Sequence, residues 1–272
     1  MYRNIIALLG DRLAFSDSNV LDVAINIAKR SDGHILGAYV LPFTSAMFST
    51  SNVADVESLH NKTEVMHEKF ESEIRAADVN GDWCNTQRDD AVAEVARQSL
   101  YADLIIFSRV EIHQSTVDKV LLTACCPMLM LPPSNISDGS FDNVLVAWKG
   151  TREAARALHD ALPILHKAND VLIVIFGESN NDEKQSMISY LAVHGINARV
   201  EEQSQESFLA EHGMQGDSDK SIGHRLLTLS KDEERDLIVM GAYGHTRLSE
   251  SVLSGVTHTV TRSAEMPVLM SH

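Results

Sequence analysis

Three glycines in the second half of the sequence stand at a spacing that could bind a phosphate. In DLIVMGAYGHTRLSESVLSGVTHTVTRSAEMPVLM, from Asp236 to Met270, an apolar strand runs into Gly241 and Gly244, and Gly255 precedes a helical run. Glycines just after a strand let the main chain approach a ligand closely, and a helix N-terminus attracts anions with unpaired N–H groups. The alternative is that the glycines only shape corners between strand, loop and helix.

The other polar residues of this stretch fit anion binding better than catalysis. His245 and Arg247 follow the second glycine and add local positive charge, and Ser254 offers a hydroxyl beside Gly255. The sequence contains no Gly-x-Ser-x-Gly nucleophile elbow, no Walker A loop and no GxGxxG fingerprint. These absences argue against a dedicated hydrolase, a P-loop ATPase and a dehydrogenase.

The composition limits the classes of partner. The 272 residues carry a formal net charge of −15 and a sequence pI near 5.1, whereas nucleic acid and anionic membranes bind basic surfaces. No apolar run approaches the roughly 18 residues of a membrane span, and the first residues lack the pattern of a signal peptide. We therefore expect a cytoplasmic protein that binds neither nucleic acid nor membrane.

Cysteines and histidines do not predict a metal centre. Three cysteines, an odd number with two adjacent, fit small buried hydrophobes better than a disulfide framework, and redox sensing by the adjacent pair is the alternative. They are Cys84, Cys125 and Cys126. His60 and Glu64 stand four apart, as do His67 and Glu71, a spacing that stacks side chains on a helix face. We interpret this helix as solvated surface and predict no metal.

The sequence contains two copies of one unit, as a search for internal similarity indicates. The matching segments are RNIIALLG (3–10) with DNVLVAWKG (142–150), ADLIIFSR (102–109) with RDLIVMGA (235–242), and CPMLML (126–131) with MPVLMS (266–271). Between the copies, PPSNISDGS is rich in turn formers. We place the domains at 1–133 and 141–272, with a linker at 134–140.

Each copy alternates short apolar strands with helical periods. A continuously apolar strand is covered on both faces, as in a parallel sheet flanked by helices. We therefore predict an α/β fold with two tandem open parallel sheets. In such sheets ligands bind beyond the carboxyl ends of the strands, and Gly241 lies at one of these ends.

The glycine spacing resembles the ATP-binding loop of the universal stress protein family. That loop has Gly-x-x-Gly, nine residues, then Gly-Ser or Gly-Thr, and here Gly241 and Gly244 are followed by HTRLSESVL and then Ser254-Gly255. The trailing helix and the Met-Pro-Val-Leu-Met strand are similar too, and two tandem copies span nearly the whole sequence. The resemblance implies a Rossmann-like sheet of five parallel strands in each copy, of the adenine nucleotide alpha hydrolase-like type. It also implies ATP, with or without Mg²⁺, as the cofactor.

The resemblance also implies a set of nucleotide-binding residues in the second copy. They are Trp148, Lys149, Ile175, Gly241, Gly244, His245, Arg247, Ser254, Gly255, Val256 and Thr257. Two positions depart from the family pattern. Ser254-Gly255 inverts the expected order, and Lys149 replaces an aspartate that faces the nucleoside. A lysine cannot accept a hydrogen bond from a ribose hydroxyl, but it can pair with a phosphate.

The first copy lacks the phosphate loop. Asp103 and Pro127 are 24 positions apart, against 31 from Asp236 to Pro267, so seven residues are missing from the loop of the first copy. The sequence SRVEIHQSTVDKVLLTACCP contains no glycine and adds Glu111 and Asp118. We predict that the first copy binds no ATP and serves as a permanent structural partner.

Three functions remain open at this point. The leading hypothesis is a stress-response protein that binds an adenine nucleotide in its second copy as a regulatory ligand, with no catalytic residue assigned and at most slow hydrolysis. The alternatives are a nucleotide-free interaction module and a slow ATPase. The resemblance further implies pairing of the terminal strands, 127–131 and 267–271, in an intramolecular pseudo-dimer and a homodimer.

Overall fold

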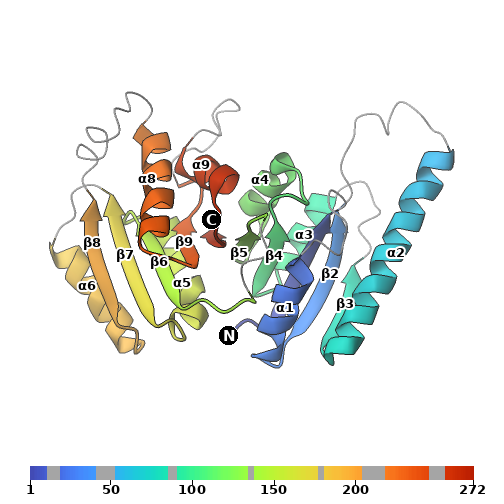
Figure 1. Cartoon of the computed structure of the whole chain (residues 1–272), viewed down its shortest axis with the longest axis horizontal. Helices are drawn as coiled ribbons and strands as arrows, with labels where there is room; N and C mark the ends of the chain where they lie inside the picture. The colour runs from blue at the N-terminus through green and yellow to red at the C-terminus, as the bar shows by residue number, and fades with distance from the viewer. Residues whose placement is uncertain are drawn as a thin grey trace. The chain divides into compact units, whose positions relative to one another are not determined.

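Two compact units, Met1–Gly139 and Ser140–His272, make up the protein (Figure 1). The computed structural model describes residues 1–10, 19–40, 53–84, 91–133, 138–176, 181–203, 218–244 and 255–272, with the backbone alone for 53–60 and 218–221. Residues 134–137 of the expected linker lie outside this part. The last two residues of the first unit contact its first helix, because Arg30 donates to the carbonyl of Gly139 and pairs with Asp138 at 3.6 Å.

The first unit is a sheet of five parallel strands in the order β3-β2-β1-β4-β5. Its elements are β1 (Asn4–Gly10), α1 (Val20–Lys29), β2 (His34–Val40), α2 (Val53–Ala77), β3 (Asn80–Cys84), α3 (Ala91–Ser99), β4 (Leu104–Ser108), α4 (Gln114–Thr123) and β5 (Met128–Leu131).

The second unit repeats this topology, with the parallel order β8-β7-β6-β9-β10. Its elements are β6 (Asn143–Trp148), α5 (Arg152–Leu165), β7 (Asp170–Phe176), α6 (Asn181–Val193), β8 (Ala198–Gln203), α8 (Ser218–Asp232), β9 (Leu237–Gly241), α9 (Val256–Ser263) and β10 (Val268–Ser271). The predicted fold class, two tandem five-stranded parallel sheets flanked by helices, is therefore confirmed.

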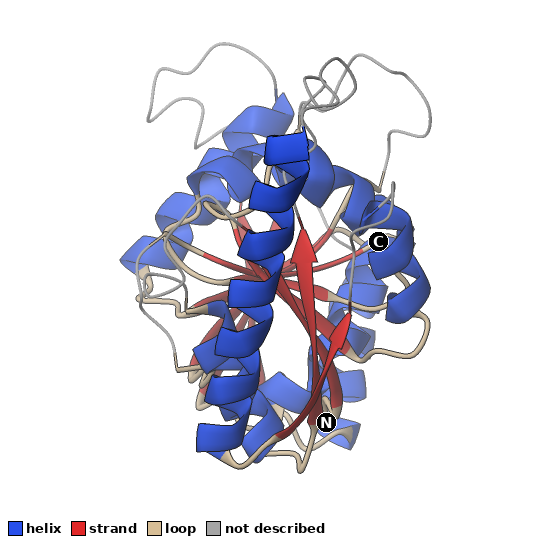
Figure 2. Ribbon diagram, turned by 90° about the vertical axis from the view of Figure 1, so that its right-hand side faces the viewer, coloured by secondary structure: helices blue, strands red, loops and turns tan. Residues whose placement is uncertain are grey.

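Apolar strands covered on both faces form the core of each unit. Ile5, Ile6 and Leu8 of β1 are at most 1% exposed, and the same is true of Val144 and Leu145 in β6. Helices lie on both sides of the strands (Figure 2). Complete burial of consecutive strand residues is the reason that the sequence shows continuous runs rather than alternation.

The strand order reverses beside the central strand of each unit. The chain passes from β1 to β2 and β3 on one side and then returns to β4 and β5 on the other, and β6 to β10 follow the same path. Ligands of open α/β sheets bind where this reversal opens a crevice beyond the carboxyl ends of the strands. We call this side of each sheet its carboxyl edge, and the opposite side its amino edge.

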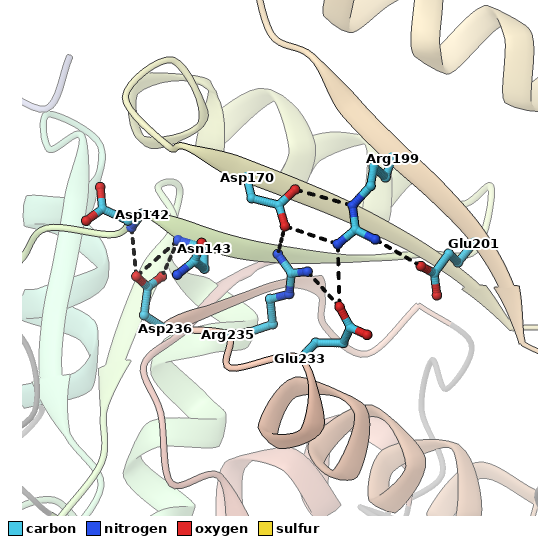
Figure 3. Close-up of polar contacts among 8 residues, drawn as sticks. All are labelled: Asp142, Asn143, Asp170, Arg199, Glu201, Glu233, Arg235 and Asp236. Carbon is cyan, nitrogen blue, oxygen red and sulfur yellow. Dashed lines mark hydrogen bonds and ion pairs between the residues drawn. The ribbon is translucent and has the colours of Figure 1, made fainter.

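One pair of contacts at the amino edge is the same in both units. Asp103, just before β4, accepts hydrogen bonds from the backbone N–H groups of Arg3 and Asn4 at 2.7 and 2.9 Å. Asp236, just before β9, does the same for Asp142 and Asn143 at 2.7 and 3.0 Å (Figure 3). Each carboxylate ties the start of the central strand to its neighbour, which confirms the internal repeat at the level of atoms.

A network of ion pairs joins three strands at the amino edge of the second unit (Figure 3). The side chain of Arg235 is 2% exposed and contacts Asp170 at 2.7 Å and Glu233 at 3.0 Å. Arg199 on β8 pairs with the same two carboxylates and with Glu201. Two arginines therefore hold the starts of β7, β8 and β9 together.

None of the helices that the structure describes combines the length and the apolar composition that crossing a membrane requires.

Candidate ligand-binding site

A four-residue turn after β9 forms the centre of the predicted site. Gly241 ends the strand, Tyr243 has a left-handed backbone with φ of 55°, and Gly244 closes the described part of the turn. A residue other than glycine rarely adopts this backbone conformation unless other contacts impose it. Contacts within the second unit must therefore hold this turn in its conformation.

The two glycines of this turn have different neighbours. A methyl group added to Gly241 would lie 2.6 Å from the backbone nitrogen of Ala154 and from the carbonyl carbon of Glu153. Packing against α5 thus requires glycine at 241 whether or not a ligand binds. Among the described residues, the atoms nearest to a methyl group on Gly244 would be side-chain atoms, Glu153 Oε2 at 3.0 Å and Thr151 Oγ1 at 3.7 Å.

The loop after β6 faces the same edge. Trp148 ends the strand, and its Nε1–H donates to Glu183 Oε1 at 2.9 Å. Gly150 follows with a left-handed φ of 62°, close to the same carboxylate. Lys149 is exposed between them, while Thr151 begins α5 by accepting from the N–H of Ala154 at 3.3 Å.

Helix α9 points its N-terminus toward this edge. Gly255 is the N-cap residue, in an extended conformation with no side-chain cap, so the first N–H groups of the helix lack intrahelical partners. Thr257 is 7% exposed, and its Oγ1 accepts the N–H of Tyr243 at 3.3 Å. This hydroxyl therefore joins the glycine turn to the helix.

The described members of the predicted set gather at one edge of the sheet. Ile175 on β7 pairs in register with Trp148, but it is only 4% exposed and offers little surface to a ligand. Val256 is half-buried at the start of α9. His245, Arg247 and Ser254 lie outside the described residues, as does the polar loop 204–217.

Two carboxylates at this edge were not predicted from the sequence. Glu153 lies in the first turn of α5 beside both glycines, and Glu183 lies in the first turn of α6 beside Trp148 and Gly150. Their only sequence signal is a place near the start of a helix that follows a strand. Both oppose the binding of a polyphosphate unless a cation lies between.

The same edge of the first unit is filled by its own chain. Counted from the paired strands, Glu111 stands where the second unit has Gly244. It is 3% exposed, and its Oε2 accepts the N–H of Gly10 at 3.3 Å. The carbonyl of Glu111 also lies directly against the α-carbon of Gly10, so a larger residue at position 10 would collide with it.

Histidines and cysteines form no metal centre within the described ranges. His67 pairs with Glu71 at 3.3 Å and stacks on Trp83, with ring centroids 5.1 Å apart. The side chain of His60 lies outside the described part. Cys84 is buried and donates to Glu94, and its burial raises the pKa of the thiol to about 11. Cys125 is exposed and Cys126 is buried, and none of the three forms a disulfide within the described residues.

Comparison with known proteins places the chain among related folds. Residues 140–272 match the universal stress protein family. A universal stress protein from Archaeoglobus fulgidus is 18% identical to this chain and has a TM-score of 0.76. The alignment covers 98% of this chain and 95% of that protein. A putative universal stress protein from Pseudomonas aeruginosa is 16% identical, with coverage of 99% and 93% and a TM-score of 0.59. No curated protein sequence is significantly similar.

Proposed function

Because the chain belongs to the universal stress protein family through residues 140–272, we propose that it is a stress-response protein with one ligand-binding unit. The second unit binds ATP or a related adenine nucleotide, and the nucleotide acts as a regulatory ligand rather than as a substrate for turnover. The first unit is a structural partner without a nucleotide.

One observation supports this division of roles. Equivalent positions after β4 and β9 hold a buried glutamate in the first unit and, in the second, a glycine whose nearest neighbours among the described residues are side-chain atoms. Glu111 accepts the N–H of Gly10 with a carboxylate, which is the kind of group that an anionic ligand would present to backbone donors. We propose that a phosphate of the ligand takes the equivalent place beside Gly244.

The described residues supply donors for a phosphate group. The N–H groups at the start of α9 and the main chain of Gly244 are the backbone donors, and Lys149 is a nearby cation. Such donors bind anions without any excess of positive charge in the protein. Mg²⁺ would offset the charge of Glu153 and Glu183 beside the phosphates.

A second candidate function follows from the same two carboxylates. Glu153 and Glu183 lie against Gly244 and Gly150, and without a cation they repel a triphosphate. If no nucleotide binds, the unit acts through its surfaces as a nucleotide-free interaction module. The expected intramolecular pseudo-dimer and the homodimer through the terminal strands remain proposals, and light scattering of the purified chain tests the homodimer.

Calorimetric titration with ATP, with and without Mg²⁺, distinguishes the two functions. We expect saturable binding at one site per chain, stronger with Mg²⁺. Gly244→Glu, which copies the first unit, should weaken binding at least about a hundredfold, because a carboxylate would occupy the space of the phosphates. Gly244→Ala is the matched control, since the described atoms nearest to its methyl group belong to the side chains of Glu153 and Thr151.

Two outcomes of these titrations would contradict the proposal. An absence of heat with nucleotide-free protein would refute the nucleotide proposal and leave the interaction module. Unchanged affinity in Gly244→Glu, with binding intact in the wild type, would place the nucleotide elsewhere in the molecule.

A further inference from the structure

His272 holds the glycine turn from the side of β10. Its Nδ1 lies 3.0 Å from the carbonyl oxygen of Ala242. A carbonyl only accepts, so Nδ1 carries the proton in this contact. The imidazole ring also meets the ring of Tyr243 edge-on, with centroids 6.5 Å apart. One side chain therefore contacts two consecutive residues of the turn.

Both neighbours of His272 are themselves constrained. Ala242 is fully buried, and its N–H donates to the carbonyl of Ser271 at 2.8 Å. Tyr243 keeps its left-handed backbone while its N–H donates to Thr257 on α9. The turn is thus linked to β10 through Ala242 and to the N-terminus of α9 through Tyr243.

Helix α5 fixes the main chain that carries His272. Arg156 Nη1 donates to the carbonyl of His272 at 2.8 Å, and Asp160 accepts from the hydroxyl of Ser271 at 2.8 Å. Arg156 and Asp160 also form an ion pair, at 3.7 Å. A positioned main chain limits where the imidazole can lie, and this favours one geometry for the contact with Ala242.

The first unit has none of these side chains at the equivalent positions. Backbone hydrogen bonds from Arg109 to Leu131 and from Ala242 to Ser271 show that Pro132 corresponds to His272. By the same alignment, Val110 stands for Tyr243 and Val117 for Thr257. Two valines and a proline offer no side-chain hydrogen bond. The contacts therefore occur only in the unit that keeps the glycine turn.

We propose that His272 is a positioning residue for the ligand site, acting through Ala242 and Tyr243 on the backbone of the glycine turn. The inference rests on the proposed function, since the ligand is the adenine nucleotide assigned to this unit. Because His272 presets the turn, the protein does not have to order it when the ligand binds, and preorganisation of this kind raises affinity.

Three substitutions separate positioning from simple stabilisation. His272→Asn keeps a nitrogen donor bonded to Cγ, where Nδ1 was, whereas His272→Gln moves the donor one carbon further and His272→Ala removes it. We expect about tenfold weaker ATP binding for the Gln and Ala variants and affinity within about threefold of wild type for Asn. Thermal unfolding, measured in parallel, reports any general loss of stability.

Two results of that titration would overturn the proposal. One is wild-type affinity in stably folded His272→Ala. The other is an equal loss of affinity in all three variants that follows their loss of thermal stability, because a structural role would not spare the Asn variant.

Hydrogen exchange of the backbone amides of Tyr243 and Gly244 tests the positioning without any ligand. We expect faster exchange in the Gln and Ala variants and wild-type protection in Asn. If exchange follows this pattern but the wild type binds no ATP, the proposed function is refuted and the role of His272 in holding the turn is kept. Unchanged exchange in every variant would overturn the positioning role.

Discussion

At the carboxyl edge of the first unit, Glu111 lies directly against Gly10, whereas at the same edge of the second unit the described neighbours nearest to Gly244 are the side chains of Glu153 and Thr151. The strands that lead to these residues pair in the same register, Ile5 with Leu104 and Val144 with Leu237. Strands that pair in the same register are therefore followed by a glutamate in the first unit and by a glycine in the second. A repeated fold can keep its sheet while the residues that follow one strand change from a glycine to a buried glutamate.

The amino edges show the reverse relation. Asp103 and Asp236 make the same contacts with backbone N–H groups in both units, so this feature belongs to the fold. Cross-strand side chains differ more freely: Asp170 pairs with Arg199 where the first unit pairs His34 with Asp82. The acidic side chain lies on β3 in the first unit and on β7 in the second, and a contact between a nitrogen and a carboxylate oxygen is present in both.

Loss of the buried arginine should break the second unit most strongly. Arg235→Ala removes a guanidinium that is 2% exposed and contacts two carboxylates, and we expect a loss of about 3 kcal/mol in the free energy of unfolding. The first unit already has alanine there, at Ala102. Urea unfolding measures the effect, and the more exposed Arg199→Ala should cost about 1 kcal/mol or less. Equal losses would show that burial does not decide the contribution.

The two glycines of the turn should differ in their effect on stability. Gly241→Ala forces a methyl group against the backbone of α5, at 2.6 Å from Ala154, and we expect a loss of about 2 kcal/mol. Gly244→Ala should change stability by less than about 0.5 kcal/mol. Chemical denaturation of both variants tests this, and a large loss for Gly244→Ala would show that this glycine is structural too.

The smallest expected effect concerns Asp236 and pH. Burial raises the pKa of this carboxyl above its usual range, against the opposing hydrogen bonds from Asp142 and Asn143. The folded state therefore holds the proton more strongly than the unfolded state, so this group adds stability as pH falls through its folded pKa toward the unfolded value of about 3.9. Asp236→Ala should cost about 1 kcal/mol at pH 7, because it removes the acceptor of the N–H groups of Asp142 and Asn143.

The same variant should lose more relative to wild type near pH 4 than at pH 7, because it lacks the titrating group. Urea unfolding across this range measures the difference between the two proteins. A difference that shrinks toward pH 4 would contradict the sign of the pKa shift. Asp103→Ala is the matched change in the first unit and should remove the equivalent backbone contacts.

The sequence alone was sufficient for the fold and the repeat, and it predicts a candidate site at the end of β9. Continuous apolar runs such as 237–240 indicate strands buried on both faces, since local patterns report burial directly. Similar sequence segments in the two halves indicate the internal repeat, and the glycine spacing marks the end of β9. These features depend on residues that are close together along the chain.

Only the tertiary structure showed which side chains surround the glycine turn and its counterpart in the first unit. Glu153 and Glu183 come from two different helices, His272 comes from the end of β10, and Glu111 takes the place of Gly244 through the register of paired strands. No local pattern distinguishes these residues from solvent-facing ones. Their contacts join elements far apart in sequence, and long-range packing rather than local propensity determines such contacts.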